Sequence, residues 1–274
     1  MVKKKTKTPQ ILWNNPHLNI PNVYKFDMSL NKAFNEYMTP RFEEKREEFV
    51  TAYMNRMIGR NEQTTVTNAN SPEGKFLAEI SVGAFEIFNT YESMLDTEIY
   101  IRKFPFSKTR IAKSRYLKNV IANHLNSIYM LKERMVRYLK VLSRRYGKRA
   151  SANAKLTSEI THILEEYTES SFHQLNSIRH SHVHNEELYD TNLERLSLLE
   201  NFINNNPSMP SIERFRGYYD FEFDRIRKMK IKEIKKINID TEEVLDMFFG
   251  LIYSIVFDES DNLITIPARR ASTH

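Results

Sequence analysis

Long stretches without glycine or proline constrain this chain more than any other feature. Only 6 glycines and 9 prolines occur in 274 residues, and most prolines lie outside the segments with regular hydrophobic spacing. Because these two residues are the ones that most often end helices, such stretches favour long helices. The apolar and polar alternation that indicates strands is almost absent. The sequence therefore predicts an all-α protein.

Hydrophobic periodicity places the helices along the chain. Apolar residues recur at steps of three and four, the spacing of one helix face, in two segments above all. The first is Leu77, Ile80, Ala84, Ile87, Tyr91 and Leu95, and the second is Ile121, Leu125, Ile128, Leu131, Met135, Tyr138 and Leu142. We predict a helix through the first and a long helix over residues 111–146 through the second, with a break around Pro105.

Weaker periodicity predicts further helices over 29–59, with a bend at Pro40, and over 157–178, 186–204 and 240–257. In the segment 157–178, Ile160, Ile163 and Leu164 are expected to face the core.

Three parts follow from this pattern. Residues 1–72 form an N-terminal arm, extended up to residue 27, and a helical extension that ends in the polar stretch 61–74. Residues 73–258 form a helical bundle, and residues 259–274 form a flexible C-terminal tail with a short extended piece at 263–266. We expect the bundle to carry the core and any active site.

Composition excludes several classes of protein. There are no cysteines, so disulfides, thiolate metal sites and a cysteine nucleophile are ruled out, and a reducing compartment is favoured. No apolar export signal follows the basic residues near Met1, and the longest apolar run, 247–257, is too short to span a bilayer. We expect a soluble, cytoplasmic protein without membrane contact.

Charge points to a polyanionic partner. Lys and Arg number 41 against 35 Asp and Glu, which gives a net charge of +6 and an isoelectric point near 9.2. Basic residues gather on one side of the long helix, where they form a candidate phosphate-binding stripe or a solvated face. They are Arg134, Arg137, Arg144, Arg145 and Lys148. The segment 225–236 is also strongly basic, with apolar residues interleaved.

The residues with the most chemical potential lie in one short segment. Arg179, His180, His182 and His184 place three of the eight histidines and a fixed cation within six residues. An imidazole with a near-neutral pKa can take the proton of a ribose 2′-hydroxyl, while a guanidinium holds the scissile phosphate. Such chemistry is ribonuclease chemistry, and it needs neither a metal ion nor another cofactor.

Arg179, the polar residue His180, three more residues and then His184 resemble the motif of the HEPN superfamily. The resemblance covers residues 76–257, with the long helix, the motif-bearing helix and the following helix in the expected order. It implies a HEPN-type helical bundle that acts as a homodimeric, metal-independent endoribonuclease on RNA, often as a toxin or phage-defence effector with a neutralising antitoxin. In that case Arg179 binds phosphate, His184 activates the 2′-hydroxyl and His180 orients the motif.

Helix geometry adds a condition to this interpretation. Residues five apart lie about 140° apart around an ideal helix, so Arg179 and His184 cannot share one helical face. Either the helix loosens between them, or a partner subunit supplies one of the two side chains.

Two other interpretations of the segment stay open. His180 and His184 share one helical face with Glu187 one turn further on, which is a spacing for metal ligands. Alternatively, the segment is a polar helix junction in a non-catalytic module that binds nucleic acid or protein. Near the basic segment, Tyr218, Tyr219, Phe221 and Phe223 either stack on unpaired bases or pack against the bundle.

Overall fold

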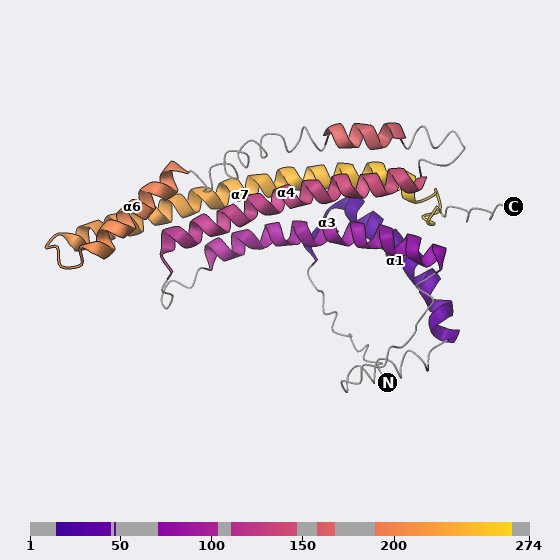
Figure 1. Cartoon of the computed structure of the whole chain (residues 1–274), viewed down its shortest axis with the longest axis horizontal. Helices are drawn as coiled ribbons and strands as arrows, with labels where there is room; N and C mark the ends of the chain where they lie inside the picture. Colours follow the sequence, from indigo (N-terminus) through magenta and orange to yellow (C-terminus); the bar gives the residue numbers. More distant parts are fainter. Residues whose placement is uncertain are drawn as a thin grey trace, which may run out of the picture.

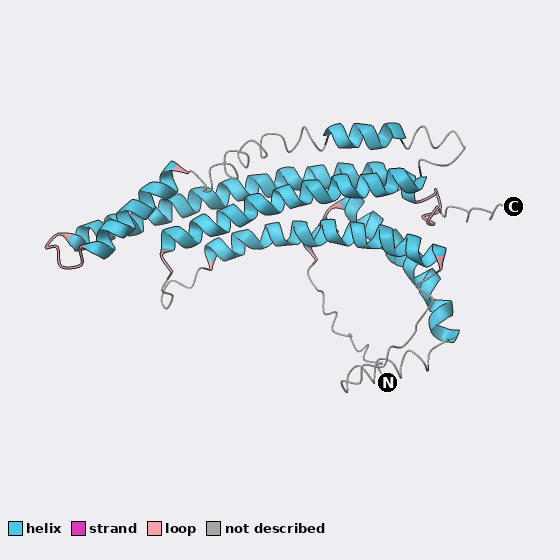
Figure 2. Ribbon diagram, in the orientation of Figure 1, coloured by secondary structure: helices cyan, strands magenta, loops and turns pink. Residues whose placement is uncertain are grey.

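The computed structural model describes residues 15–44, 47, 71–103, 111–146, 158–167 and 190–264. Nearly all of them are helical, and no strand occurs in these ranges (Figure 2). A single bridge joins Phe257 to Leu263, where a short extended piece was predicted. The prediction of an all-α protein is confirmed, and within the same ranges no helix has both the length and the apolarity to cross a bilayer.

The described helices form an elongated bundle (Figure 1). After the short 3-10 helix η1 (Pro16–Asn19) come α1 (Pro21–Glu44), α3 (Pro72–Arg102), α4 (Lys113–Tyr146), α6 (Thr191–Asn205) and α7 (Ile212–Val256). One more helical stretch covers residues 158–167. Helices α3, α4 and α7 run side by side, α6 packs on the first half of α7 and α1 packs on its second half.

Two hydrophobic cores follow each other along the bundle. One is built from α1, α3, the second half of α4 and the end of α7, and the rings of Phe26 and Phe249 meet in it edge to face at 4.9 Å. The other joins the start of α4, α6 and the first half of α7 around Leu117, Leu193 and Phe223. Because α4 and α7 contribute to both cores, these two helices hold the bundle together.

The long helix of the sequence analysis is confirmed as α4, and its predicted seam faces the cores. Leu131, Met135 and Leu142 are fully buried, and Leu125 packs against both clusters. By contrast, Ile163 was expected to face inward but is 59% exposed. Leu164 is buried and Ile160 packs against the first core, as predicted, while Thr161 takes the buried position expected for Ile163.

The predicted extended arm up to residue 27 is wrong, because α1 already begins at Pro21. Proline suits the first turn of a helix, and Asp246 of α7 accepts hydrogen bonds from the backbone and side-chain nitrogens of Asn22 at 2.8 and 3.0 Å. Val23 and Phe26 are fully buried. The helix assigned to an N-terminal extension thus shares its core with the end of α7.

The predicted helix start near Asp240 is also wrong, because α7 is one helix of 45 residues from Ile212. The Thr241 hydroxyl donates to the carbonyl of Ile237 at 2.7 Å inside the helix, so it does not cap a helix start. Upstream of it, Tyr219 and Phe223 bury their rings in the second core. That burial extends the helix through a segment whose sequence is mainly basic.

Carboxylate side chains accept hydrogen bonds from the backbone nitrogens at the starts of α4 and α6. Glu200 of α6 accepts hydrogen bonds from the backbone nitrogens of Lys113 and Ser114 at 2.9 and 3.0 Å, which caps α4. Asp190 caps α6 through the nitrogens of Asn192 and Leu193 at 2.9 and 3.2 Å. Helix α6 therefore begins at Thr191, later than the predicted start at 186.

Candidate nucleic-acid interface

The predicted catalytic residues Arg179, His180 and His184 lie outside the described residues, and so does Lys148. The alternative metal ligand Glu187 lies there too. The catalytic and metal interpretations of this segment therefore stay predictions. The first described residue after this segment is Asp190, and its contacts are known.

Asp190 is fixed to α7 by an ion pair. Its carboxylate lies 2.6 Å from the Nζ of Lys230, and the side chains are only 19% and 12% exposed. Burial by itself raises the pKa of Asp190, but the Lys230 ammonium and the two capping amides outweigh it and hold the pKa below its usual value. The pair ties the chain next to the predicted catalytic segment to the basic part of α7.

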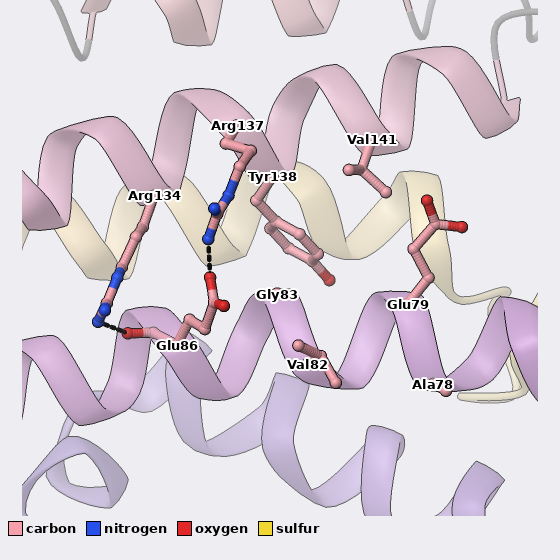
Figure 3. A pocket seen from close by; sticks show the side chains of 9 residues that line it. All are labelled: Ala78, Glu79, Val82, Gly83, Glu86, Arg134, Arg137, Tyr138 and Val141. Atoms are coloured by element: carbon pink, nitrogen blue, oxygen red, sulfur yellow. Dashed lines mark hydrogen bonds and ion pairs between the residues drawn. The ribbon is translucent and has the colours of Figure 1, made fainter.

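The arginines predicted as a phosphate-binding stripe reach from α4 to α3 (Figure 3). Arg137 pairs with the carboxylate of Glu86, and Arg134 donates to the backbone carbonyl of Glu86 at 2.9 Å. About two turns further on, Arg144 and Arg145 share Glu79, with nitrogen to oxygen distances of 2.6 Å for Arg144 and 2.7 Å for the Nε of Arg145. All four arginines thus have partners on α3. Their phosphate-binding role stays a prediction.

Between the two helices lies a cavity of about 340 Å³. It is lined by Ala78, Glu79, Val82, Gly83, Glu86, Arg134, Arg137, Tyr138 and Val141 (Figure 3). At Gly83 an added Cβ would stand 2.4 Å from Cδ2 of Tyr138, so the Tyr138 ring lies directly on the α3 backbone. The charged groups at this cavity pair with one another. We therefore interpret the region as the packing contact between α3 and α4.

The three described histidines lie in separate elements and do not form a site. His17 of η1 pairs with Glu92 at 2.7 Å, and His162 lies on the surface 3.6 Å from Glu166. His124 of α4 is 1% exposed, and burial lowers its pKa to about 4, opposed to a smaller extent by the Met94 carbonyl. Across the described ranges, no three His, Asp or Glu side chains gather as a metal ion would require.

The basic stretch of α7, residues 225–236, and the turns before it have two distinct sides in the structure. Tyr219, Phe223 and Lys230 point inward, as do the isoleucines of the stretch. An outward stripe remains, and we call it the α7 face. It consists of Arg214, Tyr218, Phe221, Arg225, Lys228, Lys232, Lys235, Lys236 and Ile239, all of them exposed. Its helical spacing was readable from the sequence, but only the buried side shows which residues point outward.

No protein-family model, no curated protein and no solved structure matches this chain. The HEPN resemblance therefore rests on the residues around Arg179 and on the order of the helices.

Proposed function

We propose that this chain cleaves RNA without a metal ion, with Arg179 and His184 as the reacting pair and His180 as the residue that orients them. The observation that carries the proposal is the concentration of a guanidinium and three imidazoles in residues 179–184. In this proposal the residues belong to a HEPN-type bundle, and the site lies in a cleft between two copies of the chain.

The chemistry needs only these side chains and water. His184 takes the proton from a ribose 2′-hydroxyl, and the 2′-oxygen attacks the adjacent phosphorus. Arg179 donates two hydrogen bonds to the phosphate and stabilises its added charge. The bond from phosphorus to the 5′-oxygen breaks, and that oxygen takes a proton from water. The products are a 2′,3′-cyclic phosphate and a 5′-hydroxyl.

The surroundings of Asp190 support the proposal. Five residues separate His184 from Asp190, and a chain of that length reaches at most about 20 Å even when extended. Asp190 is held by Lys230, in the middle of the basic stretch of α7. The chain that follows the predicted catalytic segment therefore contacts a helix rich in cations, which supports a polyanionic substrate.

Cleavage of single-stranded RNA in the presence of a chelator tests the proposal. Arg179→Ala or His184→Ala should lower the rate by about 10²-fold or more, with helicity by circular dichroism unchanged. His182→Ala, which removes a neighbouring imidazole outside the motif, is the matched control and should cut normally. Activity that chelator abolishes would support the metal site instead.

A mixing experiment tests the dimer. If Arg179 and His184 of one site come from different subunits, a mixed dimer of the two variants has one site with both side chains intact and one site with neither. A mixture of Arg179→Ala and His184→Ala proteins should then recover part of the activity that each lacks alone. Failure to recover activity, together with a monomeric mass in solution, would contradict the shared cleft.

The HEPN resemblance also implies a role for this activity in the cell. A toxin or phage-defence effector of this kind acts in the cytoplasm and is paired with a neutralising antitoxin. Expression of the chain should arrest bacterial growth, and the His184→Ala chain should not. Normal growth with soluble, RNA-cleaving protein would remove the toxin role and leave the enzyme.

A second function, a non-catalytic RNA-binding module, is favoured by one observation. The α7 face carries exposed cations, whereas the described histidines are dispersed. Tight RNA binding without any cleavage would select this function.

A further inference from the structure

The α7 face forms one continuous stripe along the helix. Its residues follow one another at steps of three and four, and on an ideal helix they fall within an arc of about 100°. The opposite side of the same turns carries Tyr219, Phe223 and Ile226 in the second core. The stripe is therefore held straight and outward by a rigid buried side.

Three lysines of this face are not neutralised by the described part of the protein, whereas Arg225 pairs with Glu222 and Lys235 with Glu98. Lys228, Lys232 and Lys236 follow each other at four-residue steps, and none of them forms an ion pair with a described residue. No carboxylate stands at a position of the stripe. Acids of the same turns lie beside the stripe and pair with other cations. Asp220 pairs with Lys113, Glu222 with Arg225, Asp224 with Arg227 and Glu233 with Lys230. Lysines four residues apart repel each other, so the face favours a bound anion.

Two aromatic rings precede these lysines on the same stripe, with Phe221 about two turns of helix before Lys228. Phe221 is 66% exposed and Tyr218 is 43% exposed, one turn of helix apart. Arg195 of α6 donates to the Tyr218 hydroxyl at 2.6 Å, which fixes the direction of that ring. At the neighbouring Gly217, an added side chain would meet no described residue within 4 Å beyond its own helix and chain neighbours, so nothing described packs on the helix at this point. Large exposed rings on one stripe with unpaired lysines are the combination that binds several consecutive nucleotides, through their bases and their phosphates.

We propose that the α7 face binds single-stranded RNA, with bases stacked on Tyr218 and Phe221 and phosphates held by Lys228, Lys232 and Lys236. The choice of RNA as the ligand rests on the proposed function, but binding is measured apart from cleavage. A duplex would offer the phosphates without free bases for the rings. A membrane surface would need a broad apolar side, whereas here cations occupy the middle of the stripe, between Phe221 and Ile239.

Fluorescence anisotropy of labelled oligouridine on the full chain tests this surface, with His184→Ala present throughout to prevent cutting. The triple variant Lys228→Gln, Lys232→Gln, Lys236→Gln should bind at least about tenfold more weakly. The salt dependence of log K should flatten by about 2, because three phosphate contacts are lost. Phe221→Ala should weaken single-strand binding about tenfold and leave binding of duplex RNA unchanged.

A control variant that loses the same charge elsewhere distinguishes an effect of the α7 face from an effect of net charge. Lys75, Lys103 and Lys140 are exposed residues on or beside other helices. Their triple change to Gln lowers the charge by the same amount, and we expect it to stay within about threefold of the parent.

Equal losses in the two triple variants would overturn the assignment, and so would stronger binding of an acidic peptide or of phosphatidylserine vesicles than of oligouridine. Cleavage assays on the chain with His184 intact keep the two proposals apart. Cutting that persists while the triple variant binds normally removes the α7 face only. Absence of cutting, with binding lost in the triple variant, removes the nuclease only.

Discussion

Two basic helix faces in this protein have similar sequences and different surroundings. The arginines of α4 lie opposite α3, where Glu79 and Glu86 provide their partners. Lys228, Lys232 and Lys236 of the α7 face form no ion pair with a described residue, whereas Lys235 of the same face pairs with Glu98 of α3. The α4 arginines connect two helices, whereas the three unpaired α7 lysines are available to a ligand.

The difference shows that a run of basic residues does not by itself define a binding surface. An arginine already paired with a carboxylate must give up that pair before it holds a phosphate, so it gains less from the exchange. The five experiments that follow test the contrast, in order of decreasing effect.

If α4 is a structural helix, the pH dependence of stability should report the burial of its His124. His124 takes up a proton near pH 6.5 in the unfolded chain but only near pH 4 in the folded protein, so the unfolded state binds more protons in between. Stability should therefore fall as the pH drops through this window, by roughly 3 kcal/mol at its lower end. Urea unfolding at several pH values measures it.

His124→Leu should flatten this dependence. Asp190, whose pKa is depressed, also costs stability on acidification, and Asp27, whose pKa burial raises, acts in the opposite sense. The measured quantity is therefore the difference between the parent and His124→Leu. Identical curves would show that the ring is not buried as described.

A matched pair of glycines compares the packing of the two faces. Gly83→Ala places a methyl group 2.4 Å from the Tyr138 ring, which should destabilise the protein by about 2 kcal/mol. Gly217→Ala meets nothing within 4 Å and should stabilise by up to about 1 kcal/mol through helix propensity. Thermal unfolding measures both. Similar changes for the two variants would contradict the assignment of one glycine to a contact and the other to open surface.

Neutralising each face in turn compares their roles in RNA binding. The α7 triple variant should lose about tenfold in affinity, or about 1.4 kcal/mol. Arg137→Gln, Arg144→Gln and Arg145→Gln together should lose about threefold or less, because their charge is already matched by Glu79 and Glu86. A larger loss from α4 would reverse the comparison and support the phosphate-binding stripe predicted from the sequence.

Removing a carboxylate from α3 tests how much the α4 pairs contribute. Glu79→Gln leaves Arg144 and Arg145 without their shared partner, and the free energy of unfolding should fall by at most about 1 kcal/mol because these pairs are partly exposed. The loss should shrink in high salt. A simultaneous gain in RNA affinity would show that these arginines bind phosphate once they are released.

The smallest effect concerns the stability of the α7 face. If its lysines serve a ligand and not the fold, changing Lys228, Lys232 and Lys236 to Gln should raise the free energy of unfolding by about 0.5 kcal/mol, through relief of repulsion. Chemical denaturation of the free protein measures it. A clear loss of stability would indicate that these residues have a structural partner.

The sequence by itself determined the helical class of the described residues and the course of α3 and α4. The reason is local: a side chain's position on a helix depends only on its spacing, so Leu131, Met135 and Leu142 could be assigned to the core in advance. It also predicts Arg179 and His184 as a reacting pair, which stays a prediction because both lie outside the described residues.

Tertiary structure decided where α1 and α7 begin and which charges stay free. Asp246 reaches Asn22 across more than two hundred residues of sequence, and Glu200 caps α4 from α6. The α4 arginines and the α7 lysines are both basic residues at helical spacing. Whether their charge is paired depends on the residues that pack opposite them. Spacing along the chain does not contain that information, because it depends on contacts between residues far apart in sequence.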